Sequence, residues 1–279
     1  MRKALLFICW LAAMPCMSQP APSRIVSMNL CSDLQLLSLV EKQRIVSLSS
    51  LATNPLYSPL AAEAVGIASN RAQADEVLQY QPDLVLTSVF SASQAANLLQ
   101  RLGYRVERLE IPDSVSAVFR LIEHVGELTG TQSLAKTRID MLQQEIAAIT
   151  SSLETLTAGK SAVFLAGNGY SHGAGTLQDD FIKSLGMQNV AADAGLIGPA
   201  PLHLETLVHG MPDFIFMNTA RPADQYMAMP LSKHPALRSM MQDSRLINLQ
   251  DAWFECGDGH ILAAYRKLAG ELLVESVQE

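Results

Sequence analysis

The sequence has little of several features that mark large protein classes. Its 279 residues include only four cysteines, and 6% of its residues are aromatic. Acidic residues outnumber basic ones by 27 to 20, so no basic field is present to hold a phosphate backbone, and we expect no nucleic acid among its partners. The longest apolar run, from Ala4 to Ala13, is about half the length of a membrane-spanning helix. Composition thus excludes disulfide-knot scaffolds, nucleic-acid-binding proteins and proteins embedded in a membrane.

The residues that are abundant are those of a globular protein with a large core. Hydrophobic residues make up 49% of the chain and charged residues 17%. At roughly 150 residues per domain, the length favours two lobes over one.

Residues 1–18 have the pattern of a secretory signal peptide. Arg2 and Lys3 precede the apolar run, and smaller, more polar residues follow it. The sequence therefore predicts an exported, soluble protein. The alternative is a lipoprotein with Cys16 as its modified first residue, although Pro15 is a poor fit to that processing.

Removing the signal peptide changes the charge and the cysteine count. The net charge moves from −7 to −9, and only Cys31 and Cys256 stay in the chain. Two cysteines of an exported chain usually pair in an oxidising compartment, so we expect a disulfide. Two buried free thiols or a metal-binding pair are the alternatives, but neither cysteine has a neighbour at metal-ligand spacing.

Short apolar strands alternate with amphipathic helices in two stretches, 24–112 and 159–279, which is typical of parallel, doubly wound sheets. Between them, residues 113–158 show only helical spacing. The last helix there, expected over 132–156, would be about 37 Å long and could join one lobe to the other. The expected strands are residues 24–28, 45–48, 83–87, 104–109, 161–165, 213–217 and 246–249. The sequence predicts two Rossmann-like α/β lobes with parallel sheets, joined by one long, rigid helix.

Each lobe also contains one copy of a short repeat. Residues 81–87 read Gln-Pro-Asp-Leu-Val-Leu-Thr, and residues 211–217 read Met-Pro-Asp-Phe-Ile-Phe-Met. An acid stands seven residues before each proline: Asp75 in the first copy and Glu205 in the second. Both acids would lie near the first turn of a helix. The pattern fits either ordinary compensation of the helix dipole or a matched pair of exposed carboxylates on the two lobes.

Two segments are expected to face a ligand because they follow strands of an open α/β sheet. The glycine-rich segment 167–175 lacks dinucleotide-binding spacing, since His172 stands where the third glycine belongs. Tyr170 and His172 would be the side chains of this segment that contact the ligand. The segment 251–259 carries Trp253, which is either a core residue or a stacking wall for a flat ligand. The six histidines form no metal-ligand pattern, so we expect no resident metal or cofactor.

Four features together resemble the periplasmic substrate-binding proteins of ABC transporters for iron–siderophore complexes and vitamin B12. They are the opening segment 24–33, the segment 75–86, the long helix, and Trp253 to Gly257. The resemblance covers Arg24 to the C-terminus and implies the class III periplasmic binding protein fold. It also implies a monomer in the periplasm that has no catalytic residues, captures a metal chelate between its lobes and delivers it to a permease dimer.

The resemblance assigns roles to individual residues. In that family an acid on each lobe engages arginines of the permease, which implies docking by Asp75 or its neighbour Glu76, and by Glu205. The ligand-binding residues that it implies lie in loops at strand ends: Asn29, Leu30, Tyr57, Ser88, Phe90, Tyr170, His172, Met229 and Trp253. These loops hold no cluster of arginines. A hydroxamate siderophore or a corrinoid therefore fits better than a strongly anionic ferric chelate.

Two other functions are compatible with parts of the sequence. One is a free-metal binding protein, for zinc or manganese, of similar architecture. The other is a periplasmic hydrolase that uses His172 with Asp179 or Asp180.

Overall fold

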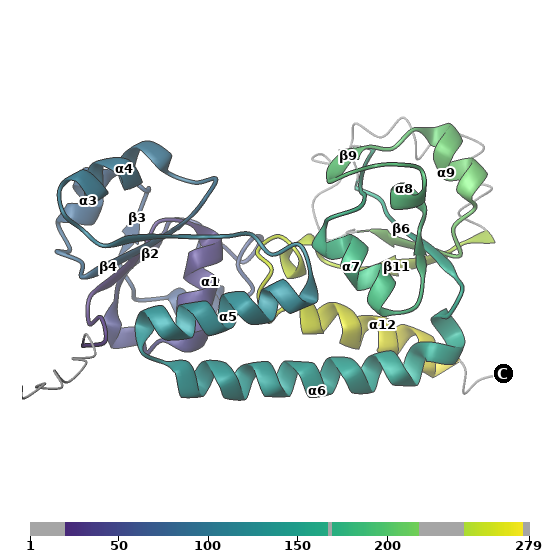
Figure 1. Cartoon of the computed structure of the whole chain (residues 1–279), viewed down its shortest axis with the longest axis horizontal. Helices are drawn as coiled ribbons and strands as arrows, with labels where there is room; N and C mark the ends of the chain where they lie inside the picture. Colours follow the sequence, from purple (N-terminus) through teal and green to yellow (C-terminus); the bar gives the residue numbers. More distant parts are fainter. Residues whose placement is uncertain (1–19, 167–168, 218–242, 276–279) are drawn as a thin grey trace, which may run out of the picture.

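The computed structural model describes residues 20–166, 169–217 and 243–275, which form two α/β lobes on a common helical base (Figure 1). The predicted signal peptide, the Cys16 alternative and Met229 lie outside the described residues. Among the residues described, no helix combines the length and the apolar character that crossing a membrane requires.

The first lobe is built on a five-stranded parallel sheet in the order β3-β2-β1-β4-β5. Its central strands are completely buried, as continuous apolar sequence predicts for a sheet covered on both faces. Helices α3 and α4 cover one face, and α1 lies on the other with the helical base (Figure 1). The elements are β1 (Ile25–Ser27), α1 (Leu30–Leu39), η1 (Lys42–Arg44), β2 (Ile45–Ser49), α2 (Ala61–Ala64), β3 (Ser69–Asn70), α3 (Ala74–Leu78), β4 (Leu84–Ser88), α4 (Ser93–Arg101) and β5 (Val106–Leu109).

The second lobe has a four-stranded parallel sheet in the order β11-β10-β6-β8 and a separate two-stranded antiparallel ribbon, β7-β9. The ribbon corrects one expectation, because residues 170–172 of the predicted ligand loop form a strand. The elements are β6 (Ser161–Phe164), β7 (Tyr170–His172), α7 (Leu177–Ser184), β8 (Gln188–Asn189), α8 (Val190–Asp193), β9 (Pro199–Pro201), α9 (Leu204–Gly210), β10 (Phe214–Met217), β11 (Arg245–Asn248), η3 (Asp251–Trp253) and α12 (Ile261–Glu275).

Two helices form the base, α5 (Val115–Thr129) and α6 (Gln132–Thr157). The chain turns between them at Gly130, whose φ of 72° is the left-handed conformation that glycine adopts without strain. Helix α5 packs on α1 of the first lobe, whereas α6 runs beneath both lobes and packs on α12 (Figure 1). The long helix predicted for residues 132–156 is confirmed.

The Pro-Asp repeat has a structural role in both lobes. Asp83 accepts hydrogen bonds from the backbone N–H groups of Ser23 (2.7 Å) and Arg24 (3.0 Å), at the start of β1. At the start of β6, Asp213 likewise accepts a bond from a backbone N–H group, that of Ser161 (2.8 Å), and one from the side-chain Nζ of Lys160 (3.0 Å). Each aspartate thus fastens the first strand of its lobe to the neighbouring strand.

The predicted disulfide between Cys31 and Cys256 is confirmed, with a Cα–Cα distance of 4.8 Å. Cys31 lies in the first turn of α1, directly after β1, and Cys256 lies after β11 and η3. The bond therefore joins the carboxyl edge of one sheet to the carboxyl edge of the other.

Candidate ligand-binding site between the lobes

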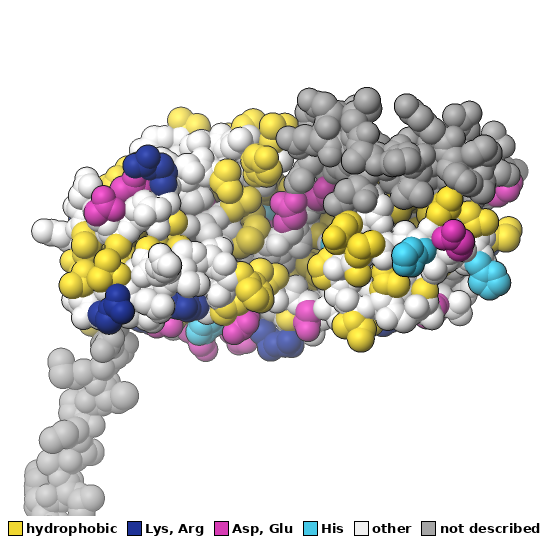
Figure 2. Space-filling view, turned by 90° about the horizontal axis from the view of Figure 1, so that it is seen from above, with side chains coloured by type: hydrophobic (Ala, Val, Ile, Leu, Met, Phe, Trp, Pro, Cys, Tyr) yellow, Lys and Arg dark blue, Asp and Glu magenta, His cyan; other side chains and the backbone are white. Residues whose placement is uncertain are grey.

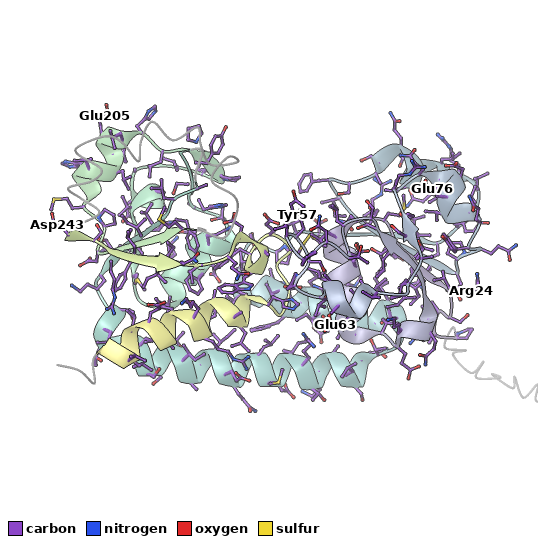
Figure 3. All side chains as sticks on the ribbon, turned by 180° about the vertical axis from the view of Figure 1, so that it is seen from behind. Arg24, Tyr57, Glu63, Glu76, Glu205 and Asp243 are labelled. Carbon is purple, nitrogen blue, oxygen red and sulfur yellow. A yellow bond between two sulfur atoms is a disulfide. The ribbon has the colours of Figure 1, made fainter. Side chains whose placement is uncertain are left out.

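The site is defined by the loops that follow the parallel strands of both lobes. Carboxyl ends of parallel strands lie at one edge of a sheet, which is where open α/β sheets bind ligands. Since the disulfide joins loops of these two edges, the two sets of loops lie next to each other. Tyr57, in the loop after β2, lies between the lobes (Figure 3). Viewed from above, hydrophobic side chains lie on both sides of the boundary between the lobes (Figure 2).

In the first lobe, the predicted ligand residues differ in their exposure. Phe90 is 80% exposed, and Tyr57 and Leu30 are half-buried. Asn29 is half-buried and caps α1, with Oδ1 accepting a bond from Ser32 N (3.3 Å). Ser88 is buried, and its Oγ donates to Ser91 Oγ (2.9 Å), so it supports the loop that carries Phe90.

In the second lobe, Tyr170 and His172 lie on β7. Its partner strand β9 lies on the side of the lobe that faces the first lobe (Figure 1). Tyr170 is 42% exposed. His172 is half-buried, and its ring meets the ring of Phe164 edge-on at 6.1 Å. Burial lowers the pKa of His172 below its ordinary value, while the charge of Asp251 acts in the opposite direction. Burial of His172 therefore favours the neutral form of its imidazole.

Trp253 lies at the edge of the core. It lies in the short helix η3, is half-buried and packs against the main core. Its neighbour Phe254 is buried and contacts Phe164 and Phe181 at 5.0 and 5.3 Å between ring centroids. This aromatic cluster fixes the segment that bears Trp253, whose side chain stays partly exposed.

The structure does not support the hydrolase considered above, which would use His172 with Asp179 or Asp180. Asp179 binds Lys183 Nζ (2.7 Å) and Asn189 Nδ2 (3.0 Å), and Asp180 accepts a bond from Val115 N (2.7 Å). Both carboxylates are thus committed to structural partners. Within the described ranges, no group of three or more His, Cys, Asp or Glu side chains could hold a metal ion.

A nucleophile motif that the sequence analysis overlooked proves to be structural. Residues 169–173 read Gly-Tyr-Ser-His-Gly, which has the G-x-S-x-G spacing of hydrolases. That chemistry needs the serine exposed on a turn between a strand and a helix. Ser171 instead lies within β7, is fully buried and donates its hydroxyl to Phe164 O (2.6 Å).

The acids predicted to dock to a permease lie on the outer ends of both lobes. Glu76 and Glu205 lie on the side that faces away from α6 (Figure 3). Glu76 accepts bonds from Arg71 N (2.6 Å) and Arg71 Nε (2.7 Å), and these bonds hold its pKa below the ordinary value. Asp75, on the same helix, and Glu205 are exposed. Glu76 thus has a local structural role that its neighbour Asp75 does not share.

One exposed side chain near the site escaped the sequence analysis. Ile197 is 82% exposed and forms a β-bridge with Ala174 beside the β7-β9 ribbon. An isolated isoleucine among glycines carries no periodic signal, so only the fold reveals that Ile197 is exposed and pairs with Ala174.

Comparisons with known proteins agree with this architecture. Residues 25–241 match the family model described as periplasmic binding protein. A cobalamin-binding protein of Halobacterium salinarum is 24% identical over 70% of this chain and 53% of its own length. The chain thus spans about half the length of the curated relatives that it matches.

Solved structures show the same fold. A possible iron-binding periplasmic solute-binding protein of Staphylococcus epidermidis superposes with a TM-score of 0.76 at 18% identity, covering 91% of this chain and 99% of the other. The periplasmic heme-binding protein RhuT of a Roseiflexus species, without ligand, gives 0.71 at 23% identity, covering 88% and 96%. Since the family model covers most of the described residues, this chain belongs to the periplasmic binding protein family.

Proposed function

We propose that this protein is the solute-binding component of an ABC importer, which captures a metal chelate between its lobes in the periplasm and delivers it to a permease dimer. The observation that carries the proposal is the joining of the carboxyl edges of two parallel sheets by the Cys31–Cys256 bond above a continuous helical base. This arrangement creates a two-walled site with no paired nucleophile and base among the described residues. In this proposal the protein binds its ligand and passes it on unchanged.

The residues of the site favour a large, largely uncharged ligand. Its described walls present the aromatic side chains of Tyr57, Phe90, Tyr170 and Trp253 and the aliphatic side chain of Leu30. They also present the imidazole of His172, whose pKa burial lowers. Aromatic side chains provide large contact areas with defined geometry for flat or macrocyclic ligands. A hydroxamate siderophore or a corrinoid fits these walls, and heme is a third candidate because relatives in fold bind iron or heme.

A titration tests ligand capture. In the chain without residues 1–18, Trp253 is the only tryptophan, so its fluorescence reports on the site. We expect ferrichrome, hemin or cyanocobalamin to quench this fluorescence saturably, with calorimetry giving the same affinity. If none of the three binds by either measurement, the proposal is wrong.

Docking to the permease is assigned to Asp75 and Glu205. Both are exposed, and they occupy equivalent positions in the two copies of the repeat, whereas Glu76 is held by Arg71. Two acids on separate lobes would orient the protein on a two-fold symmetric permease through complementary charge.

Charge reversal tests the docking role. Asp75→Lys and Glu205→Lys should leave ligand affinity unchanged but reduce uptake by cells that carry the permease. Glu63→Lys is the matched control, since Glu63 is also exposed on the first lobe but lies lower, toward α6 (Figure 3). Full uptake by the Asp75→Lys/Glu205→Lys double variant would exclude the assigned role.

A further inference from the structure

The β7-β9 ribbon is short and belongs to neither main sheet. It pairs Tyr170 with Pro201 and His172 with Pro199, so two of its three β9 residues are prolines that donate no hydrogen bond. An isolated two-stranded ribbon is marginally stable by itself. The position of Tyr170 and His172 therefore depends on what anchors the ribbon to the rest of the lobe.

One backbone bond, from Ala166 N to Tyr170 O (2.9 Å), and two buried side chains provide that anchorage. Ser171 binds Phe164 O at the end of β6, and Asn189 Nδ2 donates to His172 O (2.9 Å) from the end of β8. Asn189 is 1% exposed. Its amide nitrogen also donates to Asp179 Oδ1, and its amide oxygen accepts a bond from Ala191 N (3.1 Å), which caps α8. One carboxamide thus joins α7, α8 and the ribbon.

The first lobe contains a matching residue with a different task. Asn70 lies in the short strand β3, is 2% exposed, and accepts a bond from Ala72 N (2.9 Å). Its amide nitrogen donates to Ser27 O (2.8 Å) and Leu48 O (2.9 Å), which lie in or at the edge of the main sheet. The sheet ladder already fixes β1 and β2, whereas in the described part of the chain β7 and β9 pair only with each other and with no strand of the main sheets.

We propose that Asn189 is a positioning residue of the ligand site, which holds the β7-β9 ribbon so that Tyr170 and His172 form one wall of the gap between the lobes. The contacts of Asn189 described above support its anchoring of the ribbon, and the consequence for ligand binding rests on the proposed function. Asn70 is the matched residue that supports a sheet instead of a binding wall.

Asn189→Ser and Asn70→Ser form the matched test. A serine hydroxyl still caps the residue two positions on, but it is too short to reach His172 O. In ligand-free Asn189→Ser we expect amide hydrogen exchange of residues 169–174 to accelerate by about tenfold, as for the loss of the one hydrogen bond that Asn189 donates to the ribbon, at His172 O. We also expect the pKa of His172, read from its imidazole NMR signals, to rise toward 6.5 as the ring becomes exposed. Asn70→Ser should change neither quantity. Should Asn189→Ser fail to fold, Asn189→Thr replaces it.

Unchanged exchange and unchanged His172 pKa in Asn189→Ser would overturn the proposal, as would a rise in exchange that is equal throughout the second lobe. Titration with cyanocobalamin and hemin adds the functional measurement, in which Asn189→Ser should bind about tenfold more weakly than Asn70→Ser. Equal affinity of the two variants would contradict the positioning role. If the wild-type protein binds neither probe, binding of these two chelates is excluded, and the exchange and NMR measurements still decide whether Asn189 anchors the ribbon.

Discussion

The carboxyl group of Asp33 is buried in the first turn of α1, two residues after Cys31. Its oxygens accept bonds from Ser49 N (3.0 Å) and Ser49 Oγ, at the end of β2. Burial raises the pKa of Asp33 to about 6, and the hydrogen bonds from Ser27 and Ser49 only partly oppose this rise. The folded protein therefore holds a proton on Asp33 at a pH where the unfolded chain has already lost it.

This difference predicts a pH-dependent loss of stability. Below pH 3.8 Asp33 is protonated in both states, and its ionisation destabilises the folded state as the pH rises from 3.8 to about 6. The loss is at most about 3 kcal/mol. In Asp33→Asn this ionisation is absent. The free energy of unfolding of the variant, relative to that of the wild type, should therefore increase between pH 4 and pH 7, as measured by urea denaturation. Identical pH profiles for the two proteins would contradict the prediction.

At the same scale, the sequence revealed the Pro-Asp repeat but not what the aspartates do. Proline ends a helix through the constraints of its own backbone, so the boundary between the helix and the strand is visible in the local sequence. The partners of Asp83 and Asp213 are 60 and 52 residues away, at Ser23 and Ser161. Such pairs depend on strand order, which local patterns do not encode.

Among the secondary-structure elements, α5 and α6 pack closely at one glycine. A Cβ atom added to Gly126 would lie 2.6 Å from Ala135 Cβ. Gly270 on α12 provides a contrast, because a Cβ atom there would meet nothing within 4 Å. Both glycines lie inside helices, where alanine is intrinsically favoured by about 1 kcal/mol.

The two glycines should respond to alanine in opposite directions. Gly270→Ala should stabilise the protein by about 0.5 to 1 kcal/mol, whereas Gly126→Ala should destabilise it by about 1 to 3 kcal/mol through overpacking. Thermal and chemical denaturation measure both changes. If Gly126→Ala were as stable as Gly270→Ala, the close approach of α5 and α6 would not hold.

Long elements with a clear period were predictable, and short ones were not. The helix expected over 132–156 ends within one residue of α6, because its apolar residues repeat over seven turns. The two-residue strands β3 and β8 and the four-residue helix α8 are too short for any period to show. The ribbon was missed since the prolines of β9 argue against a strand.

At the level of the whole molecule, one apolar core extends through both lobes. It includes Ile25 and Leu84 of the first sheet, Leu142 of α6, and Phe164 and Phe216 of the second sheet. A core shared in this way resists separation of the lobes, so we expect ligand binding to cause only a small closure. The alternation of strands and helices predicted both sheets, but not this continuity, which arises from side chains that meet across the base.

The disulfide should contribute substantially to stability. It closes a loop with a sequence separation of 225, for which loop entropy gives roughly 5 kcal/mol as an upper figure, while about 2 to 4 kcal/mol is typical. We expect Cys31→Ser/Cys256→Ser to unfold at a lower guanidinium concentration than the wild type. Treatment with a thiol reductant should bring the wild type to the same midpoint and leave the variant unaffected. A wild-type midpoint that reductant does not move would contradict this contribution.

The same bond also changes what a protease can do to the protein. Cys31 and Cys256 lie near the two ends of the chain, so the bond closes a covalent ring that contains most of both lobes. A single cut anywhere between these residues opens the ring but releases no fragment. A nicked molecule would therefore migrate at full mass without reductant and divide into two pieces only after reduction, keeping its two lobes paired through a first proteolytic event.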